Sequence, residues 1–255
     1  MGNYPTNQER TAEALKNFDR EKILKYLVKS AHPVIFDVGA NVGSTLEEFK
    51  SWWPVSEIHC FEPQQECWVA LEQRADQYAA GGVVINKCAA GSVPSDQVTF
   101  YSHEMSSGTS GFNKINLQSL DSVTLSQLSG ANAQSLQEYE QSLNRERSVK
   151  VVRLDDYMST SGIHHVDLLK IDTQGFEPEV LDGFGRRLSD VDVVITELMF
   201  YDYYERSLSF SDIERFLLPA GFHLYDISHI AKNPMNGRTD WVDVIYTNKR
   251  IRTGE

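Results

Sequence analysis

The stretch VIFDVGANVGST, residues 34–45, carries the clearest structural signal in the chain. Its apolar part predicts a strand over Val34–Val38, and Gly39 and Gly43 mark a turn into a helix predicted over Ser44–Trp52. Glycine lets a backbone approach a ligand closely, and the start of a helix offers unpaired N–H groups to an anion. This strand, turn and helix predict an α/β fold with a ligand at the carboxyl end of the first strand.

Outward from this turn, short strand-like runs alternate with helical patterns, as in a parallel sheet that helices cover. The predicted strands are Val34–Val38, Ile58–Phe61, Val83–Asn86, Val166–Ile171, Val191–Leu198, Phe222–Ile227 and Trp241–Thr247. The predicted helices between them are Ser44–Trp52, Gln64–Tyr78, Pro178–Leu188 and Ser211–Leu218. Only the turn-rich segment KNPMNGRTD joins the last two strands. We therefore predict a seven-stranded, mostly parallel sheet that ends in an antiparallel hairpin.

Three features lie outside this alternation. Gln8–Ser30 has helical periodicity and predicts one amphipathic helix in an N-terminal extension over residues 1–30. Two further strands are predicted at Val98–Tyr101 and Val149–Leu154. The segment 113–148 is polar and rich in Ser, Gln and Asn, which is compatible with surface helices or with a lid over an acceptor site. Without a repeat or a linker, residues 1–255 are expected to form a single domain.

Composition narrows the classes of partner and compartment. The chain has 255 residues, of which 41% are hydrophobic and 24% charged, as is ordinary for a globular protein. A net charge of −12 without a basic stripe disfavours a nucleic-acid partner. No signal-peptide pattern opens the sequence, and no run approaches the roughly 18–20 apolar residues that span a bilayer. The cysteines lack zinc-ligand spacing and are expected to be reduced. We expect a cytoplasmic protein without a membrane partner; the oligomeric state stays open.

A second feature is expected at the same edge of the sheet. Glu62 ends the segment HCFE, residues 59–62, and follows Gly43 by nineteen residues. An acidic residue at this place in a doubly wound sheet accepts hydrogen bonds from ribose hydroxyls. The glycine turn lacks the pattern G-x-G-x-x-G, which favours S-adenosylmethionine over a dinucleotide. An NAD(P)-dependent oxidoreductase remains an alternative.

The segments DLLKIDTQGFEPEVLDGF, residues 167–184, and ITELMF, residues 195–200, resemble the FkbM family of methyltransferases. The resemblance extends to the D-V-G-A-N-x-G-S turn, to the F-E-P strand end and to Leu154–Asp156, and it covers roughly Val34 to Thr247. The positions that carry it in the first segment are Lys170, Ile171, Asp172, Gly175, Glu177, Leu181 and Gly183. It implies a Rossmann-like class I methyltransferase fold that binds S-adenosyl-L-methionine.

The resemblance further implies a cofactor site with a loop at the methionyl end, a ribose ligand, an adenine edge and a carboxylate near the sulfonium. In this chain the loop is Asp37, Gly39, Asn41, Gly43 and Ser44, the ribose ligand is Glu62, the adenine edge is Cys88 and Ala89, and the carboxylate is Asp172.

Three residues are candidates for the chemistry on the acceptor. Methyl transfer is an in-line displacement, so the protein aligns the acceptor and removes its proton. Asp172, Glu197 and His229 are expected at the carboxyl edge of the sheet. Each has a plainer alternative: a role for Asp172 in holding the cofactor alone, a structural pair of Glu197 with Lys170, and an exposed loop position for His229. Asp172 and Glu197 offer oxygen ligands to Mg²⁺ but lack an evident third ligand, so a metal requirement stays open.

The acceptor itself is suggested by the residues after the fifth predicted strand. Aromatic side chains follow it at Phe200, Tyr201, Tyr203 and Tyr204, and they suit a sugar ring or packing under the polar segment. We predict O-methylation of a hydroxyl on a carbohydrate or small secondary metabolite. A cofactor-binding protein without catalysis, acting as an interaction module, is the alternative outside enzymes.

Overall fold

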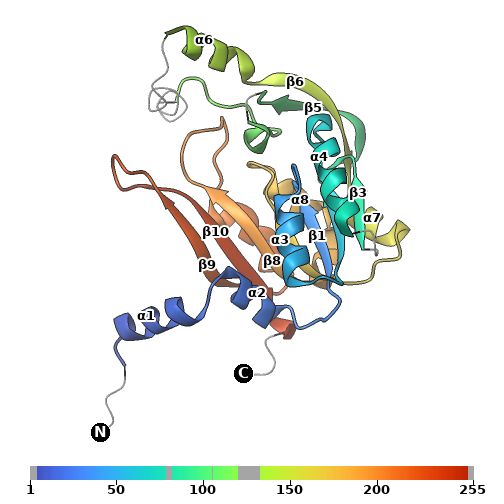
Figure 1. Ribbon diagram of the computed structural model, residues 1–255, viewed down its shortest axis with the longest axis vertical. Helices are drawn as coiled ribbons and strands as arrows, with labels where there is room; N and C mark the ends of the chain where they lie inside the picture. The colour runs from blue at the N-terminus through green and yellow to red at the C-terminus, as the bar shows by residue number, and fades with distance from the viewer. Residues whose placement is uncertain (1–4, 79–81, 105, 120–132, 252–255) are drawn as a thin grey trace.

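A twisted seven-stranded sheet runs through the protein (Figure 1), whose computed structural model describes residues 5–78, 82–104, 106–119 and 133–251. The strand order is β3-β2-β1-β7-β8-β10-β9. All neighbours are parallel except β10, which is antiparallel to both β8 and β9. The strands are β1 (Val34–Val38), β2 (Glu57–Phe61), β3 (Val83–Asn86), β7 (Val166–Ile171), β8 (Val191–Met199), β9 (Phe222–Lys232) and β10 (Thr239–Asn248). The predicted sheet with its terminal hairpin is confirmed.

Helices cover both faces of this sheet, which explains why its central strands are apolar on both sides. One face packs on α2 (Arg20–Leu27), α3 (Ser44–Trp52) and α4 (Gln65–Ala75), through residues such as Leu24 and Phe49. The other face packs on α7 (Leu154–Thr160), α8 (Glu177–Gly183) and α9 (Phe210–Leu217), through Leu181 and Ile213. The short helices η1 (Asp76–Tyr78), η3 (Gly185–Asp190) and η4 (Lys249–Ile251) complete these layers.

A second, three-stranded sheet contains the two strands that the sequence placed outside the alternation. It consists of β4 (Ala89–Ala90), β5 (Ser95–Ser102) and β6 (Arg145–Val152) in the order β4-β6-β5. The short helix η2 (Ser107–Thr109) and the helix α6 (Ala133–Ser142) lie between β5 and β6 in the chain. Figure 1 shows α6, β5 and β6 above one end of the main sheet. Leu154 begins α7 rather than ending a strand.

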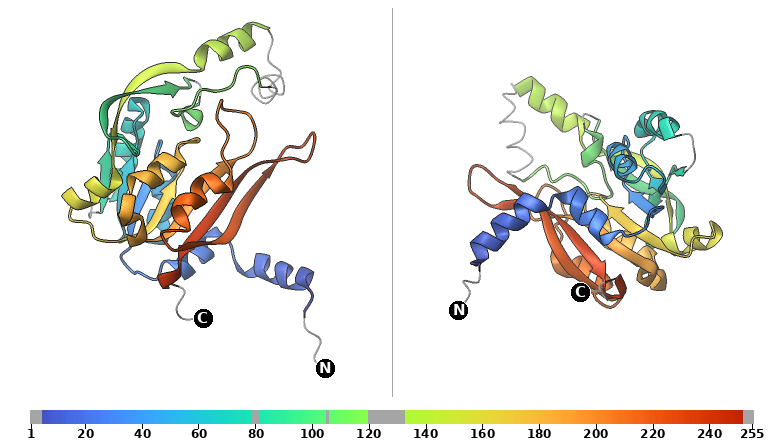
Figure 2. Two further views of the ribbon diagram at one scale, coloured as in Figure 1. Left: turned by 180° about the vertical axis from the view of Figure 1, so that it is seen from behind. Right: turned by 60° about the horizontal axis from the view of Figure 1, so that its bottom comes forward.

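The N-terminal segment differs from its prediction. Instead of one helix over Gln8–Ser30 there are two, α1 (Asn7–Asn17) and α2, because the side chain of Asp19 accepts a hydrogen bond from the Lys22 amide and starts a new helix. None of residues 7–17 is buried, and both figures show α1 projecting from the rest of the chain (Figures 1 and 2). Among the described residues, no helix combines the length and the apolar character that crossing a bilayer requires.

Candidate active site

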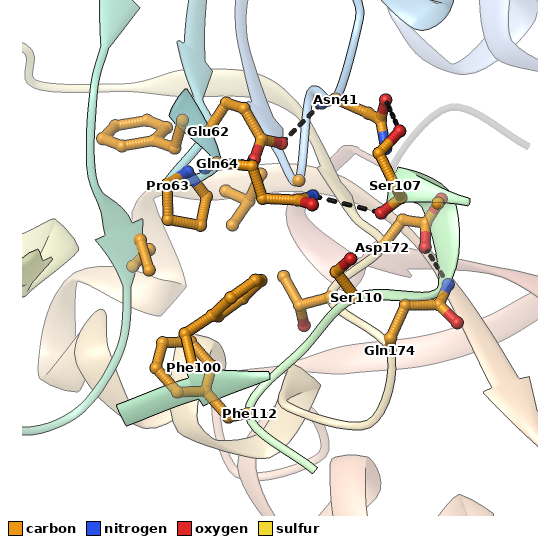
Figure 3. A pocket seen from close by; sticks show the side chains of 17 residues that line it. Asn41, Glu62, Pro63, Gln64, Phe100, Ser107, Ser110, Phe112, Asp172 and Gln174 are labelled. Carbon is orange, nitrogen blue, oxygen red and sulfur yellow. Dashed lines mark hydrogen bonds between the residues drawn. The ribbon is translucent and has the colours of Figure 1, made fainter. Parts of the chain in front are cut away.

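A cavity of about 530 Å³ lies at the carboxyl ends of β1, β2 and β7 (Figure 3). Its walls come from the turns after these strands, from β4 and β5, and from the segment that contains η2. The described residues that line it are Val38, Gly39, Asn41, Phe61, Glu62, Pro63, Gln64, Ala89, Ala90, Phe100, Ser107, Gly108, Ser110, Phe112, Asp172, Thr173 and Gln174. We call it the first cavity.

Two backbone amides hold the carboxylate of Glu62 at the first cavity. Its two carboxylate oxygens accept hydrogen bonds from the backbone amides of Asn41 and Gln64, each at 2.7 Å. Burial raises the pKa of Glu62 to about 7, against the effect of these two amides. Each oxygen retains a further lone pair, so the carboxylate is able to accept hydroxyl groups of a ligand when ionised.

The segment around η2 forms one wall of the first cavity and is held by its polar groups. The hydroxyl of Ser107 donates to Asn41 Oδ1 at 3.0 Å, and the side-chain amide of Gln64 donates to the Ser107 carbonyl at 3.1 Å (Figure 3). Ser107 and its neighbours were not predicted as site residues from the sequence. They lie more than forty residues from Gln64 and Asn41 in the chain, and no local pattern marks them.

An apolar wall completes the first cavity. Phe100 and Phe112 contact each other edge to face at 5.2 Å between ring centroids, and Phe112 stacks on Phe176 at 4.1 Å. Of the two residues predicted at an adenine edge, Ala89 lines the cavity, whereas Cys88 belongs to the buried apolar core. A flat aromatic base would fit against these rings better than against the thiol.

The glycines of the turn after β1 serve backbone packing as much as a ligand. Gly39 has φ +83°, and a Cβ there would lie 1.9 Å from the carbonyl oxygen of Asp172. Gly43 has φ +90° at the start of α3, where a Cβ would lie 2.9 Å from Leu71. Gly39 and Asn41 line the first cavity, while Gly43 and the exposed Ser44 are not among its described lining residues.

Asp37 lies beneath the first cavity and holds a lysine in place. Its side chain is fully buried, and its Oδ1 lies 3.2 Å from Lys170 Nζ. The same ammonium donates to the Gly39 carbonyl at 3.0 Å and lies 3.6 Å from Asp172 Oδ2. Burial disfavours the charged form of Lys170, but the two carboxylates outweigh it and raise the pKa of this lysine. Asp37 therefore acts on the site through Lys170 rather than through the cavity wall.

A second cavity lies on the other side of Asp172, at the ends of β7, β8 and β10. It encloses about 740 Å³ and is more open than the first. The described residues that line it are Arg20, Thr45, Lys170, Ile171, Asp172, Ile195, Thr196, Glu197, His229, Trp241 and Asp243. Among the described lining residues, Asp172 is common to the two cavities. The structure thus brings together all three residues predicted for the acceptor chemistry.

Glu197, Asp243 and His229 form a cross-strand row in the second cavity. Asp243 lies opposite Glu197 in the pairing of β10 with β8 and opposite His229 in the pairing of β10 with β9. His229 therefore lies within a strand and not in the predicted loop. Three lining residues were not predicted from the sequence: Arg20, Trp241 and Asp243. Because side chains alternate along a strand, Trp241 and Asp243 could have been expected on one face.

Burial and like charge determine the protonation of Glu197. Burial, followed by the nearby carboxylates of Asp172 and Asp243, raises the pKa of Glu197 to about 9. At neutral pH this carboxyl is therefore protonated and offers one hydrogen-bond donor. The predicted pairing of Glu197 with Lys170 is not found, because the ammonium lies on Asp37 and Asp172.

One group of possible metal ligands occurs among the described residues, and it lies away from both cavities. It consists of His165, Asp167 and Asp192, near the amino ends of β7 and β8. His165 Nε2 lies 3.0 Å from Asp192 Oδ2 and 3.7 Å from Asp167 Oδ1. Hydrogen bonds to Asp167 and then Asp192 raise the pKa of His165 to about 9, so a protonated histidine accounts for this group without a metal.

The chain is similar to known methyltransferases in both sequence and fold. The model of the methyltransferase FkbM domain matches residues 37–224. The 2-O-methyltransferase NoeI of Sinorhizobium fredii is 29% identical over 188 residues, which cover 71% of this chain and 70% of that protein. The 31-O-demethyl-FK506 methyltransferase FkbM of Streptomyces tacrolimicus is 30% identical over 154 residues, which cover 59% of this chain and 58% of that protein.

Among solved structures, the fold is similar to that of the methyltransferase FkbM from Methylobacillus flagellatus. The TM-score is 0.50 at 13% sequence identity, over 85% of this chain and 44% of that one. The chain thus spans less than half of that longer protein and less than two thirds of the Streptomyces protein.

Proposed function

Since this chain belongs to the FkbM family of methyltransferases and uses S-adenosylmethionine, we propose that it methylates a hydroxyl oxygen of a carbohydrate or small secondary metabolite. Family membership excludes the nicotinamide-dependent alternative. The relatives named above include a 2-O-methyltransferase and a 31-O-demethyl-FK506 methyltransferase, which supports oxygen as the methylated atom.

The first cavity fits the cofactor by the chemistry of its walls. We assign the ribose hydroxyls to Glu62, whose carboxylate retains lone pairs toward the cavity, and the base to the apolar wall of Ala89, Phe100 and Phe112. Asp172, at the opposite end, offers negative charge to a cation. When bound, the cofactor supplies an electrophilic methyl group on a positively charged sulfur.

The second cavity is our proposed acceptor site, and the observation that carries this assignment is that Asp172 lines both cavities. A group held in the second cavity is thereby next to a group held in the first. The walls are polar, with Arg20 and Asp243 beside the protonated carboxyl of Glu197, and Trp241 adds one aromatic face. Such a mixture suits a polyhydroxylated acceptor that presents hydroxyls and an apolar ring face.

His229 is our candidate for removal of the acceptor proton. Glu197 is unsuited to this role at neutral pH because it is already protonated. Both oxygens of Asp172 already face a partner, Gln174 at Oδ1 and Lys170 at Oδ2. His229 lines the second cavity, and Asp243, opposite to it, would stabilise the imidazolium that forms. In-line transfer would require the second cavity to hold the acceptor oxygen beside Asp172, on the side of the methyl group opposite the sulfur, while His229 takes the hydroxyl proton.

Methyl transfer from methyl-labelled S-adenosylmethionine to a panel of sugars and hydroxylated metabolites tests this function. We expect a product whose methyl group resists mild alkali, as an ether does and an ester does not. His229→Gln should lower the rate by about 10²-fold or more, while His223→Gln, at an exposed position of the same strand, should not. Binding of S-adenosylmethionine without turnover on any acceptor would instead support the non-catalytic alternative.

A further inference from the structure

The turn after β7 holds Gln174 in a conformation that ordinary side chains avoid. Its φ is +56°, and Gly175 follows with φ +93°. A residue other than glycine in this left-handed region is strained by roughly 1 kcal/mol or more. The turn brings the side chain of Gln174 back beside Asp172, with both at the wall of the first cavity (Figure 3).

The side-chain amide of Gln174 is fixed at both of its ends. Its Nε2 donates to Asp172 Oδ1 at 2.7 Å, and its Oε1 accepts from the hydroxyl of Tyr204 at 2.8 Å. The reversed amide would set its carbonyl oxygen against the carboxylate of Asp172 and is therefore disfavoured. The carboxylate of Asp172 thus determines which end of Gln174 faces it, and Tyr204 holds the other end.

Tyr204 connects this amide to the wall of the first cavity. Its hydroxyl lies 2.9 Å from the carbonyl of Thr109 in η2, so Thr109 and Gln174 share its single hydrogen. The ring is 3% exposed and packs with Ile115 and Leu143, on either side of α6 in the chain. The hydroxyl of Tyr204 is therefore held by the segment around η2, which forms one wall of the first cavity.

We propose that Gln174 and Tyr204 are positioning residues that aim the carboxylate of Asp172 at the positive charge of the bound cofactor. This inference rests on the proposed cofactor site. Asp172 Oδ1 is held by Gln174 while Oδ2 faces Lys170. Without the amide the carboxylate would be free to turn toward Lys170, away from the cavity. A side chain shorter than that of Gln174 would not span from Tyr204 to Asp172.

The affinities of two ligands, compared in each variant, separate a change in the aim of Asp172 from general damage to the site. S-adenosylmethionine carries the sulfonium charge, and S-adenosylhomocysteine differs from it only by lacking the methyl group and, with it, that charge. A correctly aimed carboxylate favours the charged ligand alone. The dissociation constants of both ligands, measured by calorimetry, give a ratio that a merely structural change would leave unaltered, because it would weaken both ligands alike.

We expect Tyr204→Phe and Gln174→Asn to shift this ratio against S-adenosylmethionine by about five- to tenfold, in the direction given by Asp172→Asn. Asparagine tolerates the left-handed conformation better than glutamine, so Gln174→Asn should keep its thermal stability while losing the bridge. Tyr203→Phe is the matched control, since its ring is equally buried and lies 5.0 Å from that of Tyr204, but its hydroxyl is directed to Tyr139 and Thr109.

An unchanged ratio in Tyr204→Phe and Gln174→Asn would overturn the proposal, and so would an equal shift in Tyr203→Phe. A ratio unaffected by Asp172→Asn would also overturn it, because the carboxylate would then not face the sulfonium. If the wild-type protein bound neither ligand, the proposed cofactor site would itself fail. That failure appears in the wild-type protein, whereas failure of the positioning proposal appears only in the ratios of the variants.

Discussion

The pKa of Glu62 makes cofactor affinity depend on pH in a predictable direction. Because burial raises this pKa to about 7, roughly nine tenths of the carboxyl is ionised near pH 8 and one tenth near pH 6. The ionised form accepts the ribose hydroxyls more strongly. The dissociation constant of S-adenosylmethionine should therefore rise about tenfold as the pH is lowered from 8 to 6. Calorimetric titrations at both pH values in one buffer series measure it.

Glu62→Gln is the corresponding variant. The glutamine oxygen can still accept one backbone amide, but its NH₂ group meets the other amide, of Asn41 or Gln64, as donor against donor. Each charge-assisted bond to the ribose contributes about 1.5–3 kcal/mol, so we expect affinity to fall about ten- to a hundredfold near pH 8. The remaining affinity should no longer change over the same pH range.

The stability of the ligand-free protein should show the opposite trend. A folded pKa above the ordinary value of 4.5 means that folding favours the protonated Glu62, so this contribution is complete below about pH 4.5 and is lost as pH rises through about 7. The loss is about 3 kcal/mol relative to Glu62→Gln. Equal affinities near pH 6 and pH 8, or wild-type affinity in Glu62→Gln, would refute the assignment of Glu62 to the ribose.

Three further substitutions test features around the site. Gly39→Ala should lower the free energy of unfolding by about 3 kcal/mol or more, because its Cβ would meet the Asp172 carbonyl; a wild-type denaturation midpoint would contradict this close approach. Lys170→Met leaves the buried carboxylate of Asp37 without its cation and should cost about 3–5 kcal/mol. Asp37→Asn in the same chain should restore part of that loss, and no restoration would mean that the two residues are uncoupled. His165→Gln should lower the melting temperature below about pH 6.5, and the difference from wild type should vanish as pH rises through about 9, since the histidine's stabilisation is lost there. The effect should stay under about 1 kcal/mol because the side chain is 44% exposed, and a difference that persists at high pH would contradict it.

The elements around the glycine turn were predictable because their signals are local. β1 and α3 have the predicted bounds, since an apolar run, two glycines and an apolar helical pattern follow directly in the chain. The prediction of one N-terminal helix was wrong because its periodicity continues across Asp19, whose side chain caps the start of a second helix. The end of β9 was not predicted because Ile230 is the one strand-favouring residue in Ser228–Lys232, which becomes a strand by pairing with β10.

Residues of the candidate site were predictable from the sequence only where they belong to a local motif. Glu62 follows from its spacing after the glycine turn, and Asp172 from the turn after β7. Ser107 and Tyr204 reach the first cavity through contacts between segments 60–100 residues apart, which leave no local pattern. Asp243 depends on the register of two strand pairings, which the sequence does not specify residue by residue.

The position of β10 has a consequence for the order in which the protein is assembled during synthesis. β10 is the last of the seven strands to leave the ribosome, yet it lies between β8 and β9 in the sheet. Until it emerges, β8 ends the nascent sheet with an open hydrogen-bonding edge and β9 has no neighbour to join. The half of the sheet beside Glu62 is able to form first, whereas Glu197, Asp243 and His229 meet only at the final step. A ribosome stalled before residue 239 should therefore carry a chain that exposes the β8 edge and is a ready substrate for chaperones.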